Sequence, residues 1–319
     1  MSVLQMLNII IPTALFVAAP LIFTALGGVF SERSGVVNIG LEGLMIIGAF
    51  AGILFNLTFA DVFGNMTPWL SILAGLVAGA LLSVLHAVAS ITFKADQTVS
   101  GVAINFLAAG LAIFLVKLLY DKGQTDRIQV SFNKFDVPIL SDIPIIGKMF
   151  FQGGYITSYV AIIVAFIVFF ILYKTPFGLR IRSVGEHPMA ADTMGINVVK
   201  MRYIGVILSG AFAGVGGAVY AMIISRDFSH ATISGQGFMA LAAVIFGKWH
   251  PLGAMGAALF FGLAQGLSII GGTLPFLKNI PAVYLLILPY VLTILALTGF
   301  IGRADAPKAS GIPYIKGKR

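Results

Sequence analysis

The residue types that most often carry out catalysis are present, but their spacing matches no catalytic motif. The histidines at positions 86, 187, 230 and 250 form no H-E-x-x-H pair, and no G-x-S-x-G string marks a serine nucleophile. The Gly-Lys pairs at 147–148, 247–248 and 317–318 lack the Ser or Thr that follows in a phosphate-binding loop. Cysteine is absent, which excludes thiolate metal ligands and disulfides. The sequence therefore predicts no catalytic residue, no metal site and no ATP bound by this chain.

A few polar side chains within apolar runs suit recognition better than catalysis. Glu42 begins an apolar run, where it is either a carboxylate favoured by a helix N-terminus or a substrate or gating group. The neutral amides could hydrogen-bond a polar solute in a translocation path or join neighbouring helices. We predict a substrate path from Asn38, Glu42, Asn105, Gln236 and Gln265.

The composition requires a membrane around most of the chain. Of 319 residues, 59% are apolar and 10% are charged, whereas a soluble globular domain has about 25% charged residues. The mean hydropathy is +1.00. The net charge of +8 fits basic cytoplasmic loops and is no evidence for nucleic-acid binding. We expect an all-α integral membrane protein that forms a single domain over residues 1–319.

The helical spans can be placed from the apolar runs, since about 20 helical residues cross the hydrocarbon core. Eight runs are long enough, near 9–30, 41–60, 69–92, 98–119, 156–173, 203–225, 253–273 and 282–300. A further stretch, about 236–247, is shorter. It is either a broken helix completed by the segment before it or a re-entrant piece that lines a cavity. Counting it as a crossing, we predict 8–9 transmembrane helices.

The glycines point to close helix contacts. The chain has 37 glycines, and small residues spaced four apart allow membrane helices to approach closely. The pairs Gly75/Gly79, Gly210/Gly214 and Gly262/Gly266 are therefore assigned to packing.

One local self-match indicates an inverted repeat. Glu42-Gly-Leu-Met45 matches Gln236-Gly-Phe-Met239, and the predicted crossings run through these two strings in opposite directions. Inverted repeats with broken helices near the midplane are a recurrent transporter architecture. The match predicts a substrate path near residues 38–45 and 232–239.

The basic residues set the orientation. Of the two sides of the predicted bundle, one holds most of them: Arg33, Lys94, Lys174, Arg180, Arg182, Lys200, Arg202, Lys248, Arg303, Lys308, Lys316, Lys318 and Arg319. The other holds Lys122, Arg127, Lys134, Lys148, Arg226 and Lys278. The positive-inside rule then places the C-terminus in the cytoplasm and the N-terminus outside.

The predicted orientation places three hydrophilic segments on one side of the membrane or the other. Residues 121–155 form an external loop that either docks a binding protein or caps the bundle, and residues 301–319 form a basic cytoplasmic tail. Residues 174–202 are cytoplasmic and contain a short predicted helix that starts at Pro188 and stops at Gly195. This helix either fits a groove on a partner or is a plain surface helix.

The string GVFSERSGVVNIGLEG, residues 28–43, resembles the N-terminal signature of permease subunits in bacterial ATP-binding-cassette (ABC) importers. This branch includes the ribose and branched-chain amino-acid permeases. More narrowly, the string is similar to nucleoside permeases that work with a lipoprotein receptor of the basic membrane protein type. Segments that match the same family in the same order are 97–110, 185–196 and 237–247, followed by Pro251 and Gly253, so the resemblance covers most of residues 10–300.

The resemblance implies a type II importer-like permease in the bacterial cytoplasmic membrane, moving nucleosides such as guanosine into the cell. Its implied partners are a second homologous permease in a heterodimer, a cytoplasmic ABC ATPase that holds ATP and Mg²⁺, and an external lipoprotein receptor. It implies a coupling helix that seats on the ATPase through Gly185, Glu186, His187, Ala190, Ala191, Asp192 and Gly195. His187 stands where many relatives carry Asn, so we expect a weaker helix cap.

Other functions remain open at this point. Ribose, other sugar and branched-chain amino-acid permeases share the same order of motifs, and no residue in the chain can be assigned to recognition of a purine ring. A secondary carrier would use Glu42 to take up a proton and would need no ATPase. A membrane-embedded enzyme lacks paired catalytic carboxylates and metal-ligand spacing, and a purely structural membrane protein has no need of a docking helix.

Overall fold

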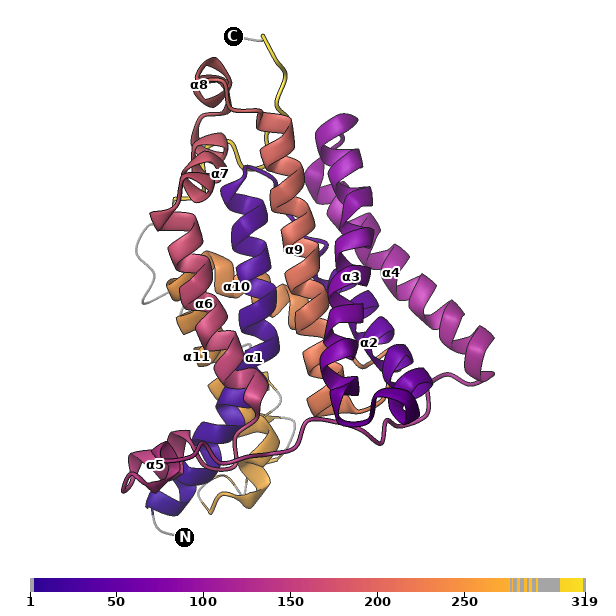
Figure 1. Cartoon of the computed structure of the whole chain (residues 1–319), viewed down its shortest axis with the longest axis vertical. Coiled ribbons are helices and arrows are strands. Elements are labelled where there is room, and N and C mark those ends of the chain that lie inside the picture. Colours follow the sequence, from indigo (N-terminus) through magenta and orange to yellow (C-terminus); the bar gives the residue numbers. More distant parts are fainter. Residues whose placement is uncertain are drawn as a thin grey trace.

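Long helices lie side by side along the longest axis of the molecule (Figure 1). The structure, a computed structural model, describes residues 3–275 and 305–317 together with 277, 280, 281, 284, 285, 287, 288 and 291. Its α-helices are α1 Val3–Arg33, α2 Leu41–Phe63, α3 Thr67–Ala87, α4 Gln97–Tyr120, α5 Ile146–Phe150, α6 Ile156–Lys174, α7 Pro176–Glu186, α8 Pro188–Thr193, α9 Val198–Tyr220, α10 Gln236–Phe246 and α11 Pro251–Ile270. The described residues include no strand, only isolated bridges between Gln124 and Ser229 and between Phe135 and Gly154.

The membrane-crossing helices agree with the apolar runs. Six segments of the described chain are long and apolar enough to cross. One of them, Leu41–Thr92, has 52 residues, far more than the roughly 20 that one crossing needs. It bends at the short 3₁₀ turn Gly64–Met66 and so supplies both α2 and α3. The predicted span at 282–300 lies almost entirely outside the described residues.

The stretch predicted near 236–247 is a half-helix. With 11 residues, α10 is about 16 Å long at 1.5 Å per residue, half the hydrocarbon thickness. The residues before it, 226–235, are irregular rather than helical, so the preceding segment does not complete a broken helix, which was one of the two predicted alternatives. Their buried side chains Phe228 and Ile233 hold them inside the bundle.

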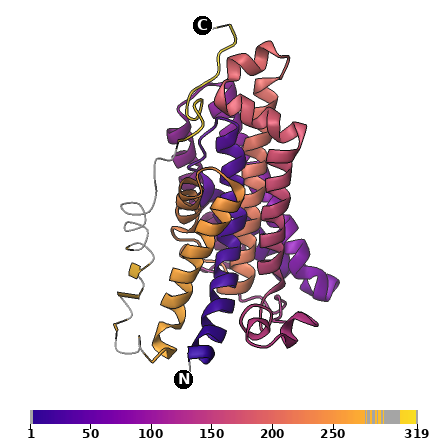
Figure 2. The same ribbon diagram turned by 90° about the vertical axis from the view of Figure 1, so that its left-hand side faces the viewer.

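Two ends of the bundle differ in charge. The end with α7, α8 and residues 305–317, called here the basic end, also holds Arg33, Lys94 and Lys248. The opposite end, called the loop end, holds α5 and residues 121–155. Figures 1 and 2 place the start of α1 at the loop end and residues 305–317 at the basic end.

Glycines set the closest helix contacts, as their spacing predicts. A Cβ added at Gly75 or Gly79 of α3 would meet the backbone of Gly214 or Gly210 of α9, and one added at Gly262 of α11 would meet Ala18 of α1. The bare backbones of α3 and α9 therefore touch where larger side chains would separate them.

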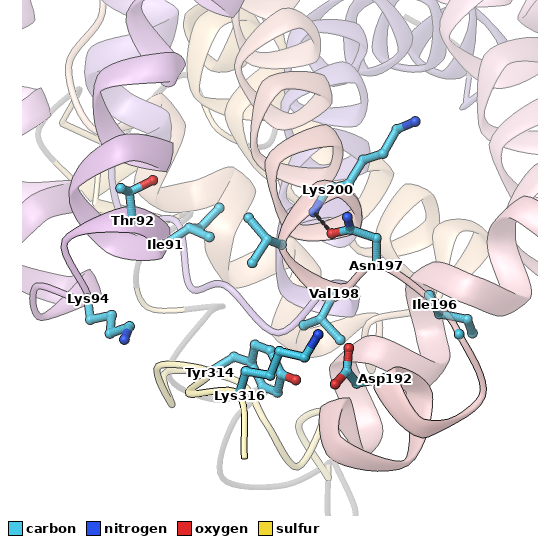
Figure 3. A pocket seen from close by; sticks show the side chains of 12 residues that line it. Ile91, Thr92, Lys94, Asp192, Ile196, Asn197, Val198, Lys200, Tyr314 and Lys316 are labelled. Carbon is cyan, nitrogen blue, oxygen red and sulfur yellow. Dashed lines mark hydrogen bonds between the residues drawn. The ribbon is translucent and has the colours of Figure 1, made fainter. Parts of the chain in front are cut away.

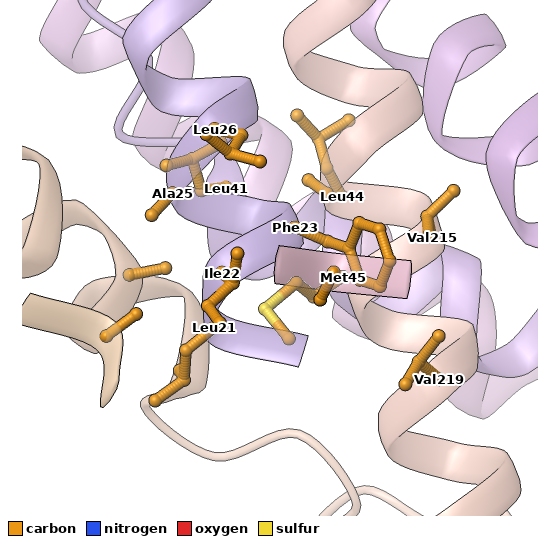
Figure 4. Close-up of a cluster of buried hydrophobic side chains, with 14 of the residues drawn as sticks. Leu21, Ile22, Phe23, Ala25, Leu26, Leu41, Leu44, Met45, Val215 and Val219 are labelled. Atoms are coloured by element: carbon orange, nitrogen blue, oxygen red, sulfur yellow. The ribbon is translucent and has the colours of Figure 1, made fainter. Parts of the chain in front are cut away.

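The apolar core lies where α1, α2 and α9 meet (Figure 4). Its side chains include Leu21, Ile22, Phe23, Ala25, Leu26, Leu41, Leu44, Met45, Val215 and Val219. Here α9 packs closely along both α1 and α2, and so joins these two helices directly after the chain has turned at the basic end. That packing fixes the position of the start of α2, on which the candidate site depends.

The loop at residues 121–155 covers the loop end. Its backbone carbonyl at Val130 accepts a 2.9 Å hydrogen bond from the amide of Asn56 on α2. Its Ser131 hydroxyl donates to the carbonyl of Met222, directly after α9, at 2.6 Å. The loop is thus tied to the ends of two core helices.

Candidate functional site

A non-helical segment, residues 36–40, separates α1 from α2 inside the bundle. Its backbone is satisfied by side chains from neighbouring helices: Val37 N–H donates to the Gln97 amide oxygen at 2.7 Å, and the Val37 carbonyl lies 3.1 Å from His86 Nε2. Because a carbonyl only accepts, His86 Nε2 carries the proton, and Nδ1 accepts from the Ser100 hydroxyl at 2.9 Å. This buried histidine is a structural residue of the break.

Two of the predicted path amides hold the same break. Asn38, 1% exposed, donates to the Ser209 hydroxyl at 2.9 Å and accepts from Gly40 N–H at 3.1 Å. Asn105 accepts from Gly43 N–H at 2.7 Å and donates to the Ile39 carbonyl at 3.0 Å. Both amides are engaged in joining α9 and α4 to the start of α2.

The carboxylate of Glu42 joins the starts of two helices. Glu42 lies in the first turn of α2, and its two oxygens accept from Gly235 N–H and Gly237 N–H at the start of α10, each at 2.6 Å. The N-termini of α2 and α10 therefore meet at one carboxylate. The negative charge lies between the positive ends of two helix dipoles.

This meeting point brings the two repeat strings together. The strings beginning at Glu42 and Gln236 each start a helix, and α2 runs towards the loop end while α10 runs towards the basic end, as an inverted repeat predicts. The irregular backbone before α2 is mostly buried in protein, where membrane proteins tolerate it, and the segment before α10 is anchored by the buried residues Phe228, Thr232 and Ile233.

The remaining two predicted path residues pair with each other. The Gln265 amide on α11 donates to the side-chain oxygen of Gln236 at 3.2 Å and lies 3.2 Å from the sulfur of Met239. Gln236 is 9% exposed. The five predicted residues are thus divided between the break before α2, the start of α10 and one contact from α11.

The electrostatics of this region suit a neutral polar solute better than chemistry. Across the described residues no three His, Asp or Glu side chains gather as a metal site. Glu42 is already held by backbone donors, and the amides offer donors and acceptors of either kind. Nothing in this geometry assembles a nucleophile with a base.

The predicted coupling segment forms two helices instead of one. Thr175 caps α7 by accepting from Gly178 N–H, and Pro176 takes its first position. The chain turns at His187, whose Nδ1 accepts from Ala190 N–H at 3.2 Å and so caps α8. Gly195, with φ at +80°, adopts the left-handed conformation just beyond α8. The predicted start at Pro188 and stop at Gly195 are confirmed. The helix α7 was not predicted, although the pair Thr175-Pro176 in the sequence is typical of a helix start.

The predicted coupling residues face in two directions. Gly185 and Ala191 are buried in the chain itself, and a Cβ at Gly185 would clash with the carbonyl of Arg33. Glu186, His187 and Ala190 are exposed. Gly195 is exposed as well and Asp192 is half-buried, so the surface open to a partner lies at Glu186, His187, Ala190 and Gly195.

The tail at residues 305–317 lies across this segment. Ala309 N–H donates to the Gly185 carbonyl, and Arg202 Nη1 donates to the Ile312 carbonyl, both at 2.9 Å. Arg202, counted from the sequence among the basic residues of this side, is 1% exposed. Burial, followed by the neighbouring Asp192 carboxylate, raises the pKa of the Tyr314 phenol.

A cavity of about 800 Å³ opens beside α8 (Figure 3). Asp192 on α8 and Tyr314 and Lys316 of the tail point toward one another, while the amine of Lys200 points away. The opposite wall is the turn at Thr92 and Lys94 between α3 and α4. Sequence reasoning placed Asp192 in the coupling surface but gave no signal for the tail beside it.

A family comparison agrees with this architecture. Residues 10–297 match the family described as the permease component of branched-chain amino acid transport systems. The chain belongs to this family. The permease therefore uses an all-α fold whose long helices, half-helix and basic end are those described above.

Named relatives resemble the permease along most of its length. It is 69% identical to the guanosine ABC transporter permease protein NupQ of Bacillus subtilis and 54% identical to the nucleoside ABC transporter permease protein NupC of Lactococcus lactis, in each case over 100% of both chains. A second L. lactis protein, the nucleoside ABC transporter permease protein NupB, is 25% identical over 77% of the permease and 68% of its own length.

Proposed function

We propose that the permease is the membrane subunit of an ABC importer that moves nucleosides, guanosine among them, into the cell. The observation that carries this proposal is the 69% identity to a guanosine permease over the whole of both chains. Because the match spans the whole of both chains, every membrane-crossing part of this chain has a counterpart in that relative. The absence of a phosphate-binding loop from the sequence agrees with an energy source on another subunit.

The basic end faces the cytoplasm in this proposal, with the N-terminus outside and the C-terminus inside. Support comes from the gathering of Arg33, Lys94, Lys248 and the tail lysines Lys308 and Lys316 at that end. The exposed surface where α7 passes into α8, at Glu186, His187 and Ala190, is the seat for an ATPase, and that ATPase binds the ATP and Mg²⁺.

The importer contains a second, different permease subunit. L. lactis has two proteins named as nucleoside permeases, NupC and NupB, which are 54% and 25% identical to this chain. Two unequal relatives in one organism are what a heterodimer requires. A lipoprotein receptor delivers the solute at the loop end, where residues 121–155 are exposed in part.

The substrate path runs beside the start of α10. Gln236 and Gln265 carry amide groups that can exchange their mutual 3.2 Å hydrogen bond for bonds to a ribose hydroxyl or a base. Asn38, Glu42 and Asn105 hold the backbone around this path. A nucleoside is neutral and rich in donors and acceptors, which matches amides better than charges.

The competing proton-carrier function is disfavoured by one observation. Both oxygens of Glu42 accept hydrogen bonds from backbone N–H groups of α10. A carboxyl group that binds and releases a proton in each cycle would weaken one of these bonds each time, because protonation removes the negative charge and makes one oxygen an O–H donor that faces an N–H donor.

Uptake of radiolabelled guanosine, adenosine, uridine, ribose and leucine tests the proposal. Cells with and without the permease are compared before and after ATP depletion, and before and after collapse of the proton gradient. We expect nucleoside uptake that stops with ATP depletion and survives the uncoupler. Uptake of ribose or leucine alone would overturn the substrate class, and uptake lost only with the uncoupler would overturn the energy source.

A further inference from the structure

Arg33, the last residue of α1, is bonded to three separate segments at the basic end. Its Nε donates to the carbonyl of Trp249 at 2.8 Å, and its Nη2 donates to the Tyr173 hydroxyl at 3.2 Å. Its Nη1 lies 3.6 Å from a carboxylate oxygen of Glu186. One guanidinium thus joins the turn between α10 and α11, the end of α6 and the end of α7.

The turn held by Arg33 has an unusual backbone. Lys248 and Trp249 are consecutive non-glycine residues with φ of 54° and 53°, a conformation that costs on the order of 1–3 kcal/mol for each such residue. Such a turn persists only when neighbours determine it. Here Arg33 binds its carbonyls, the one at Lys248 at 3.4 Å, and the indole N–H of Trp249 donates to the carboxylate of Glu32.

This turn is one end of α10, and Glu42 is bound at the other. The half-helix has 11 residues, so it is short enough to move as a rigid rod of about 16 Å. A shift of the turn at Trp249 is therefore a shift of the N–H groups of Gly235 and Gly237 that hold the Glu42 carboxylate.

The other partner of Arg33 belongs to the coupling segment. Glu186 ends α7 and immediately precedes the cap of α8, and Gly185 packs directly on the backbone carbonyl of Arg33. Movement of α7 and α8 cannot leave the end of α1 undisturbed, because no space separates them.

We infer that Arg33 is a positioning residue that transmits movement of α7 and α8 to α10 and, through α10, to the carboxylate of Glu42. This inference rests on the proposed function, since it takes an ATPase seated on α8 as the source of the movement. Arg33 binds no solute and no nucleotide. Its planar guanidinium is required because it donates to a carbonyl and a hydroxyl and pairs with a carboxylate at once, which a lysine ammonium cannot do in the same fixed geometry.

The first test compares Arg33→Lys with Arg182→Lys in the importer purified with its partner subunits. Arg182 is a matched control at the same end: its Nε donates to the Leu172 carbonyl at 2.9 Å and its guanidinium lies 4.5 Å from the Tyr173 ring centre, so it ties α7 to α6 without contacting the α10–α11 turn. We expect guanosine uptake per ATP hydrolysed to fall roughly tenfold in Arg33→Lys, within the range of measured coupling between sites, and to stay near wild type in Arg182→Lys. Equal ratios in the two variants would overturn the inference.

The second test follows the turn between α10 and α11 directly. The permease contains two tryptophans, so the emission of a Trp69→Phe variant, less that of a variant that also lacks Trp249, reports on Trp249 alone within the assembled importer. We expect ATP to change this emission, and Arg33→Lys to abolish the change. ATP-driven uptake with no response from Trp249 would refute the inference alone, whereas absence of ATP-driven uptake in the wild type would refute the proposed function.

Discussion

The carboxylate of Glu42, in the first turn of α2, accepts a 2.6 Å hydrogen bond from the backbone N–H of Gly237, in the first turn of α10. Glu42 begins one string of the internal repeat, and Gly237 is the second residue of the other, 195 positions along the chain. Two helix N-termini that meet head to head repel each other through their dipoles, and a carboxylate between them reverses that repulsion.

Replacement of Glu42 by Gln tests this role. The amide keeps one oxygen acceptor and places an NH₂ donor against a backbone N–H, so one cap is lost and one contact becomes repulsive. We expect the free energy of unfolding to fall by about 1–2 kcal/mol, the cost of losing a helix cap. Thermal unfolding of the purified permease in detergent measures it.

The control for this variant is Asp61→Asn, which removes an exposed carboxylate from the other end of the same helix and is expected to leave stability unchanged. Uptake by Glu42→Gln is also expected to remain insensitive to an imposed proton gradient. A variant that lost proton-driven uptake while keeping its stability would identify Glu42 as a proton carrier instead of a cap.

The sequence predicted that Glu42 lies at a helix N-terminus, and it does, but the helix whose N–H groups it binds is α10. Periodicity and composition locate a carboxylate along its own helix. They carry no distance between α2 and α10, which the packing of α1, α2 and α9 determines. The match between the strings at Glu42 and Gln236 was the available signal, because inverted repeats place corresponding residues near one axis.

Gly237→Ala is expected to disrupt the same junction by a steric route. A Cβ at this position would overlap the backbone of Glu42 and Leu41, which cannot rotate away as a side chain can. We expect a loss of about 1–3 kcal/mol, as for other overpacked sites, measured as a lower unfolding temperature and a lower yield of folded protein.

Gly256→Ala in α11 is the matched substitution, since a Cβ there meets nothing within 4 Å. It is expected to be neutral or to stabilise the helix by about 0.5–1 kcal/mol, because alanine loses less backbone entropy than glycine on folding. Equal destabilisation by both variants would show that glycine matters for backbone freedom at these positions and not for close contact.

The coupling segment shows which features local sequence can predict. Pro188 and Gly195 mark the start and stop of α8 because both act through their own backbone geometry. The burial of Arg202 and the contact of Arg33 with Trp249 depend on segments far apart in the sequence, joined only by the fold. The sequence assigned Arg202 to the basic side of the membrane but carried no signal for its burial.

Two neighbouring alanines of α8 are expected to respond differently to enlargement. Ala191 is 3% exposed, whereas Ala190 points outward. Ala190→Trp is expected to leave thermal stability within about 0.5 kcal/mol of wild type, as at other surface sites, and to abolish ATP-dependent uptake by blocking the seat on the ATPase. Ala191→Trp is expected to lower thermal stability, and uptake only as a consequence, because the larger side chain would have to enter the core. Normal uptake by a stable Ala190→Trp variant would exclude this face as the docking surface.

The stability of the basic end is expected to depend on pH through His250. Burial, followed by the positive charge of Arg33, lowers the pKa of His250 in the folded permease, and its ring packs at a tilt against the rings of Phe169 and Tyr173. The unfolded chain, whose histidines titrate near pH 6.5, therefore binds a proton more readily than the folded chain. Stability from this group is fully present above that pH and is lost as the pH falls towards the lower folded value.

We expect the unfolding temperature to drop between about pH 7.5 and about pH 5. The drop is expected to be smaller in His250→Phe, because phenylalanine keeps an aromatic ring against Phe169 and Tyr173 but takes up no proton. His230→Asn, at an exposed position of the loop end, serves as the control; an equal pH response in His250→Phe and wild type would exclude His250 as the cause.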